Sequence, residues 1–223
     1  MKTKFAVILL LAVFTMSGCA YIQKAKRTDE LEIENANLRN RISQLEKDKT
    51  KEVKRVYEQK DRELSELERA KQELEESLKK EIGEYKAKLQ MTERGLVITF
   101  VSEIFFDSGK DKVKEDGKTT LNKVAEVLNR DVPNSGVAVE GHTDNDPIKY
   151  SGWKSNWELS SARALAVLHY LVDGCKLAPN RLSANGYGEF HPVAPNDSIQ
   201  NKQKNRRVEI VILPSKLSKV KAN

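Results

Sequence analysis

The chain has 223 residues, of which 39% are hydrophobic and 32% are charged, and its formal net charge is +6. Charged residues gather before residue 95 and apolar clusters after it, which excludes a protein that is globular throughout and leaves one core of roughly 120 residues in the second half. Lys and Arg alternate with Glu and Asp along the first half without interleaved aromatic residues, so no nucleic-acid partner is expected.

The N-terminus has the pattern of an export signal. Two lysines precede an apolar run over residues 5–14, which is short for a membrane span. Residues 16–19, Met-Ser-Gly-Cys, resemble a bacterial lipobox, in which the chain is cut before the cysteine and the thiol is acylated. We therefore predict a lipoprotein signal peptide over residues 1–18 and lipidation at Cys19. An ordinary signal peptide with a coincidental cysteine is the alternative.

The lipobox resemblance also implies an anchor and a compartment. Two or three acyl chains on Cys19, palmitate among them, would hold the chain on a membrane, since each buried CH₂ contributes about 0.8 kcal/mol. An aspartate directly after the lipidated cysteine would argue against the outer membrane. Ala20 stands at this position instead, which indicates the outer membrane of a Gram-negative bacterium, on its periplasmic face. Cys175 then remains as a single thiol, so no intramolecular disulfide is expected.

After a linker over residues 19–28, the sequence predicts one long helix over residues 29–92. This segment holds no proline and a single glycine, Gly83. Leu31, Leu38 and Leu45 are seven residues apart, and a second heptad register begins one residue out of phase at Val53. Self-association or a partner helix through residues 29–90 is one interpretation. The other is a single solvated helix with i,i+4 ion pairs, and either gives a spacer of roughly 90 Å.

The second half alternates strands with helices and predicts an α/β (α+β) fold. The order β-α-β-α-β-β implies a mixed β-sheet packed by two main helices, preceded by the long coiled-coil-like arm. A polar loop over residues 188–205 has room for a short helix, and a basic tail covers residues 215–223. The expected elements are an opening strand or extended pair over residues 96–106, helices over 113–128 and 155–173, and strands over 137–141, 182–187 and 207–213.

The strongest local signal is a pair of opposite charges where a strand ends and a helix begins. The segment Gly-His-Thr-Asp at residues 141–144 closes a strand, and Asn156 opens the following helix. Asn156, Ser160 and Arg163 share one helix face, which Asp144 approaches from the strand end. A carboxylate accepts from an ammonium group and a guanidinium binds a carboxylate, so the pair suits a zwitterionic amino-acid head group. A structural salt bridge between Asp144 and Arg163 is an equal alternative from geometry alone.

Four motifs resemble those of the OmpA-like peptidoglycan-binding domain, the family of the OmpA, Pal and MotB C-terminal domains. The resemblance covers residues 95–214 and implies a domain that clasps the diaminopimelate residue of the peptidoglycan stem peptide without a covalent bond. The motifs are Gly-His-Thr-Asp at 141–144, Asn-x-x-Leu-Ser-x-x-Arg-Ala at 156–164, Gly-Tyr-Gly-Glu at 186–189 and Asn-Arg-Arg-Val-Glu-Ile at 205–210, after an opening Phe-Asp-Ser-Gly at 106–109.

The same resemblance implies a role for each residue of the site. Asp144 would hold the ammonium group of diaminopimelate and Arg163 its carboxylate. Asn156 would position the ligand. The remaining site residues, which flank the pocket or form its rim, are Thr143, Leu159, Phe106 and Asp107.

The connection over residues 145–155 is longer than in the porin-type domains and resembles the MotB branch of the family and related lipoproteins. It leaves open whether the outer contacts to the ligand change. A flagellar stator is disfavoured because the N-terminal apolar run has no acidic residue to carry ions.

We therefore expect binding and not catalysis. No nucleophile-elbow or metal-ligand pattern accompanies His142 and Asp144, so the chain is predicted to be no enzyme and to need no cofactor or metal. The predicted function is an outer-membrane lipoprotein that tethers this membrane to the cell wall. The alternative is an envelope scaffold whose coiled-coil arm recruits a partner protein, with wall binding only localising it.

Overall fold

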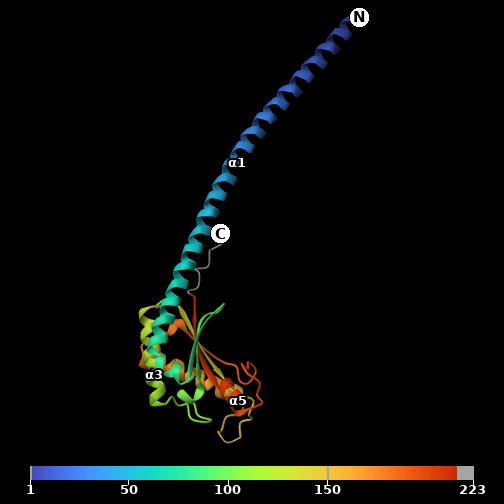
Figure 1. The fold of residues 1–223 in the computed structure, drawn as a ribbon. Helices are drawn as coiled ribbons and strands as arrows, with labels where there is room; N and C mark the ends of the chain where they lie inside the picture. The colour runs from blue at the N-terminus through green and yellow to red at the C-terminus, as the bar shows by residue number, and fades with distance from the viewer. Residues whose placement is uncertain (1, 150, 215–223) are drawn as a thin grey trace. The chain divides into compact units, whose positions relative to one another are not determined.

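The computed structural model describes residues 2–149 and 151–214, with side chains from residue 23 onward (Figure 1). The chain forms two compact units, divided after Glu58. Cys19 and the predicted signal peptide lie outside the described side chains, and the basic tail over residues 215–223 lies outside the described residues. Within the described residues, no helix has the length and apolar character needed to cross a membrane.

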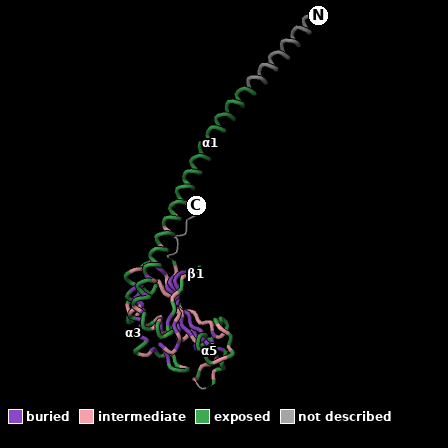
Figure 2. The backbone as a smooth tube through the Cα atoms, in the orientation of Figure 1, coloured by how far each residue is buried: buried purple, intermediate pink, exposed green. Residues whose placement is uncertain are grey.

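The first unit consists of one helix, α1, which spans Lys2–Ser77 and runs on into the second unit. The segment predicted as a linker over residues 19–28 is part of this helix. Every described side chain from Gln23 to Arg55 is exposed, as Figure 2 shows in green along the helix. This stretch therefore has no core of its own, and its stability as a helix depends on local propensity or on a partner.

The C-terminal end of α1 belongs to the folded domain and is not a free spacer. Leu67, Ala70, Leu74 and Leu78 are all buried in the main hydrophobic core. The first three are three and four residues apart and so share one face of α1, and Leu78 follows directly after this helix. The apolar seam after residue 66 therefore packs against the chain's own sheet.

The helix predicted to continue to residue 92 ends earlier, which corrects that boundary. A short helix α2, Lys79–Gly83, follows α1, and Tyr85 turns the chain with a φ of 57°. Strand β1 then covers Ala87–Thr92, with burial that alternates along the strand. Composition concealed this strand, because its Lys and Gln residues resemble those of the helix, whereas its alternate Ala, Leu and Met residues pack against the core.

The domain is built on one mixed five-stranded sheet, which confirms the predicted fold class and adds β1 to the predicted order. The strands lie in the order β1-β2-β5-β3-β4, with β3 and β4 parallel and the other neighbours antiparallel. Beyond β1, the strands are β2 Gly95–Val101, β3 Gly136–His142, β4 Leu182–Gly186 and β5 Arg207–Leu213.

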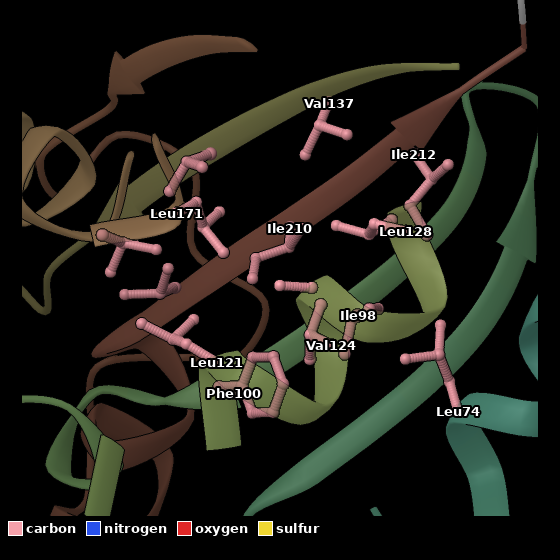
Figure 3. Close-up of a cluster of buried hydrophobic side chains, with 14 of the residues drawn as sticks. Leu74, Ile98, Phe100, Leu121, Val124, Leu128, Val137, Leu171, Ile210 and Ile212 are labelled. Atoms are coloured by element: carbon pink, nitrogen blue, oxygen red, sulfur yellow. The ribbon is translucent and has the colours of Figure 1, made fainter. Parts of the chain in front are cut away.

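The two predicted helices pack on one face of this sheet together with the end of α1. They are α3, Glu115–Arg130, and α4, Asn156–His169, while the polar loop before β5 contains a short helix α5, Ile199–Asn205. Figure 3 shows Leu121 and Val124 of α3 beside Ile98 and Ile210 of the sheet, with Leu74 of α1 in the same cluster.

Glycines bring α4 directly onto the strands that carry the candidate site. A Cβ atom at Gly141 would lie 2.1 Å from the backbone oxygen of Ser160, and one at Gly186 would lie 2.1 Å from Ser161 Oγ. Neither position has room for a side chain. The glycines of the two motifs therefore bring the ends of β3 and β4 close to the middle of α4, where Arg163 lies, while Asp144 follows β3.

Candidate functional site

A cleft of about 850 Å³ lies at the end of β3, bounded by the start of α4, the loop after β2 and the connection between β3 and α4. All the residues predicted for the site line this one cleft. They are Phe106, Asp107, Thr143, Asp144, Asn156, Leu159 and Arg163.

Asp144 is held at the cleft by two interactions. Its Oδ1 accepts a hydrogen bond from the backbone N–H of Asp146 at 3.1 Å, and its Oδ2 pairs with Arg206 Nη1 at 2.6 Å. The side chain is 7% exposed. The carboxylate is therefore fixed in direction before any ligand arrives, which lowers the entropy cost of binding a cation.

Arg163 is buried in the wall of the cleft and is anchored through carbonyl groups. Its Nε donates to the carbonyl oxygen of Lys110 at 2.9 Å and its Nη2 to that of Asp107 at 3.2 Å. Its guanidinium carbon lies 5.2 Å from the centroid of the Phe106 ring. Burial lowers the pKa of Arg163 from its usual value, although a guanidinium stays charged at neutral pH.

The two opposite charges do not neutralise each other. Among the residues described, Arg163 forms no ion pair, and the ion-pair partner of Asp144 is Arg206. Arg163 Nη1 donates to none of the described residues, which leaves a charged donor for a ligand. The salt bridge between Asp144 and Arg163 that the sequence left open is therefore not formed.

Asn156 connects the start of α4 to the surrounding loops. Its Nδ2 donates to the carbonyl oxygen of Asp146 at 3.1 Å and to Glu189 Oε2 at 2.6 Å. The carbonyl oxygen of Gly188, in the same loop as Glu189, accepts from the backbone N–H of Thr143 at 2.9 Å. The Gly-Tyr-Gly-Glu motif thus fixes the end of β3 relative to the start of α4.

The longer connection between β3 and α4 takes part in lining the cleft. Pro147, Ile148 and Lys149 line it. Trp153 Nε1 donates to the carbonyl oxygen of Gly109 at 3.0 Å and so joins this connection to the opposite rim. A ligand in the cleft would therefore contact this connection.

Two residues that sequence reasoning did not assign to the site also form part of it. Arg206 pairs with Asp144 and, at 3.0 Å, with Glu103 Oε1. Burial would lower the pKa of Arg206, but its hydrogen bonds to these two carboxylates raise it. Arg206 stands in the Asn-Arg-Arg motif, so a motif signal existed, but nothing in the sequence indicated which acid it would pair with.

Some oxygen atoms of the cleft residues are left without a partner. Ser102 Oγ, Glu103 Oε2 and Thr143 Oγ1 are buried and form no hydrogen bond with the described part of the chain. Buried acceptors without donors are costly, and they are uncommon in folded proteins. Of these three groups only the Glu103 carboxylate is restricted to accepting when ionised, because the two hydroxyls can also donate.

A second polar cluster lies on the face of the sheet opposite the helices. Among the described residues, it is the one group of acidic and histidine side chains that lie close enough together to hold a metal ion. Potential ligand atoms of Glu140, His142 and Glu209 lie within 4.8 Å of one another. Arg94 pairs with Glu140, and Arg207 pairs with Glu209 at 2.6 Å. Because both carboxylates already have cationic partners, this cluster offers a metal ion little uncompensated negative charge.

His142 itself is buried and neutral. Burial, aided by the nearby positive charge of Arg207, lowers the pKa of His142 to about 3. Its ring stacks on Tyr187, with centroids 5.1 Å apart and planes inclined by 18°. Because its lowered pKa keeps it neutral near pH 7, this histidine packs the strand end and has no charge to offer a ligand.

The domain is a mixed five-stranded sheet with a cleft at the end of β3, and this cleft is lined by side chains of both charges. The comparisons name its family: residues 105–206 of the chain match the model of the OmpA family. This is a peptidoglycan-binding family of structural proteins and not of enzymes, which confirms the resemblance inferred from the four motifs.

The relatives of the chain include a motility protein and an outer membrane protein. It is 40% identical over 149 residues to Motility protein B of Bacillus subtilis, covering 67% of this chain and 57% of that protein. It is 37% identical over 113 residues to Outer membrane protein Omp38 of Acinetobacter baumannii, covering 51% of this chain and 30% of Omp38. The chain thus spans about half the length of the first of these curated relatives and less of the second.

A solved structure supports the same fold. The structure of the cell wall anchor of the T6SS from Pseudomonas aeruginosa matches with a TM-score of 0.58 and 31% identity, covering 63% of this chain and 96% of that one.

Proposed function

We propose that this domain binds peptidoglycan without a covalent bond by holding the free end of diaminopimelate in the cleft. That end carries an ammonium and a carboxylate on one carbon. The observation that carries the proposal is the pair Asp144 and Arg163, which line one cleft without pairing to each other. In this arrangement Arg163 Nη1 binds the carboxylate and Asp144 accepts from the ammonium.

The ammonium end has a second source of affinity in the acceptors around Asp144. Glu103 and Thr143 each present a buried oxygen without a donor, and an ammonium group has three N–H donors in a compact head. Arg206 already shares Asp144, so the ligand joins an existing charge network and does not meet an isolated carboxylate.

The test is a calorimetric titration of the domain with two soluble stem peptides that differ in one residue, diaminopimelate or lysine. The lysine side chain ends in an ammonium alone, so the two peptides differ by the carboxylate that Arg163 is proposed to bind. A buried charge-assisted pair is worth enough that we expect the lysine peptide to bind at least about 100-fold more weakly, or about 2.7 kcal/mol. Equal affinity for the two peptides would reject the proposed role of Arg163.

We further propose that the chain is an outer-membrane lipoprotein, so that wall binding tethers the membrane to peptidoglycan. The Met-Ser-Gly-Cys sequence before Ala20 supports lipidation at Cys19. Similarity to Omp38, an outer membrane protein, and to a cell wall anchor supports an envelope role that joins two layers. The helix after Cys19 then provides the distance between the lipid and the wall.

Lipidation is tested by growing cells with labelled palmitate. We expect the chain to incorporate the label and to fractionate with outer membranes, and a Cys19→Ser variant to lose both properties. Cys175→Ser is the matched control, because it also removes one thiol but leaves the lipobox intact. Label retained in Cys19→Ser, or wild-type chain recovered with inner membranes, would contradict the proposal.

A further inference from the structure

The exposed part of α1 carries an apolar stripe that the domain does not use. Leu31, Leu38 and Leu45 recur every seven residues and are 48%, 50% and 60% exposed. Asn35 and Ile42 occupy the intervening positions, and Ile42 is 55% exposed. In heptad terms the leucines are d residues, while Asn35 and Ile42 are a residues.

Charged residues flank this stripe on both sides, at the heptad positions that face a second helix. Among the described residues, none of these flanking side chains forms an ion pair, whereas further along the chain Lys54 pairs with Glu58 and Lys71 with Glu75. The flanking residues are Arg27, Glu34 and Arg41 at g positions and Glu32, Arg39 and Glu46 at e positions.

Two parallel copies of this helix in register would pair all of these charges with opposite partners. A g residue of one strand faces the e residue five positions later on the other strand. The resulting pairs are Arg27 with Glu32, Glu34 with Arg39 and Arg41 with Glu46, each formed twice by symmetry. Residues five apart lie on different sides of a single helix, so these pairs cannot form within one chain.

The residues at a and d positions favour the parallel arrangement over the antiparallel one. Antiparallel strands would also match opposite charges, such as Glu34 with Arg41, but they would bury Asn35 against Leu38. Parallel strands set Asn35 against Asn35 of the second copy, where the two amides can bond to each other. Ile42 at an a position with leucine at d positions is the combination that favours two parallel strands.

We propose that residues 27–49 of two copies of this chain form a parallel two-stranded coiled coil. The first unit then presents paired helices, and each pair carries two copies of the second unit. The inference does not rest on the proposed ligand, because it uses only residues before Glu58 and its test contains no peptidoglycan.

The test is sedimentation equilibrium of the full-length chain in a mild detergent. We expect a reversible dimer. An Arg39→Glu variant places like charges opposite each other twice per dimer, so its dissociation constant should rise about tenfold. The double variant Glu34→Arg with Arg39→Glu restores the parallel pairs and should recover most of this loss. Lys47→Glu, a charge reversal at an f position on the outer side, is the matched control and should leave the dimer unchanged.

Each remaining outcome would overturn the proposal. A wild-type chain that stays monomeric at all concentrations shows that the stripe remains solvated. A dimer insensitive to Arg39→Glu associates elsewhere. In antiparallel strands residue 39 faces residue 32 and not residue 34. If Glu34→Arg with Arg39→Glu weakened the dimer further than Arg39→Glu alone, and Glu32→Arg with Arg39→Glu restored it, the strands would be antiparallel.

Discussion

Replacing Arg163 with glutamine is expected to abolish the discrimination between diaminopimelate and lysine stem peptides. The variant removes the charged donor facing the cleft, so affinity for the diaminopimelate peptide should fall at least about 100-fold. The lysine peptide has no carboxylate at this position and should lose little. The measurement is the calorimetric titration described above, repeated on the variant with both peptides.

Two further variants distinguish binding from folding. Arg163 also donates to the carbonyl groups of Asp107 and Lys110, so a distorted cleft would weaken both peptides equally. Arg163→Lys keeps the charge without the planar fork and should bind diaminopimelate with intermediate affinity. Asp144→Asn should weaken both peptides alike, because both carry the ammonium group. If Arg163→Gln lowered both affinities by the same factor, the direct contact with the ligand carboxylate would be rejected.

Replacing Leu74 with alanine is expected to cost the domain about 2–5 kcal/mol of unfolding free energy. Leu74 is fully buried although it lies in α1, well before the strand Gly95–Val101. Removing its side chain leaves a cavity between helix and sheet. Urea unfolding followed by the fluorescence of Trp153 and Trp157, both in the domain, measures the change.

Leu64→Ala provides the matched control. Leu64 stands ten residues earlier in the same helix and is 47% exposed. Alanine favours a helix at least as well as leucine, so this variant should change stability by less than about 0.5 kcal/mol. Equal costs for the two variants would show that the end of α1 is not part of the core. A chimaeric chain that exchanges the arm for another helix should accordingly keep everything from Leu67 onward.

The sequence located the candidate site better than it located the boundaries of the domain. Spacing along α4 places Asn156 and Arg163 on one face, and a strand ending at His142 brings Asp144 to the same place. Both inferences depend on local periodicity, which a sequence displays directly. The strand at residues 87–92 was missed because its polar alternate residues match the composition of the helix before it.

The sequence by itself determined which charged groups this protein has, on which elements they stand, and the family to which its motifs belong. Only the tertiary structure decided how those groups are paired. Asp144 meets Arg206, which is 62 positions away, and not Arg163 on the neighbouring helix. Which of the two arginines pairs with Asp144 depends on distances of a few ångströms. The glycines that bring α4 onto the sheet set these distances, together with the position of β5 in the middle of the sheet. Periodicity along the chain carries no information about such distances, because electrostatic pairing depends on separation in space.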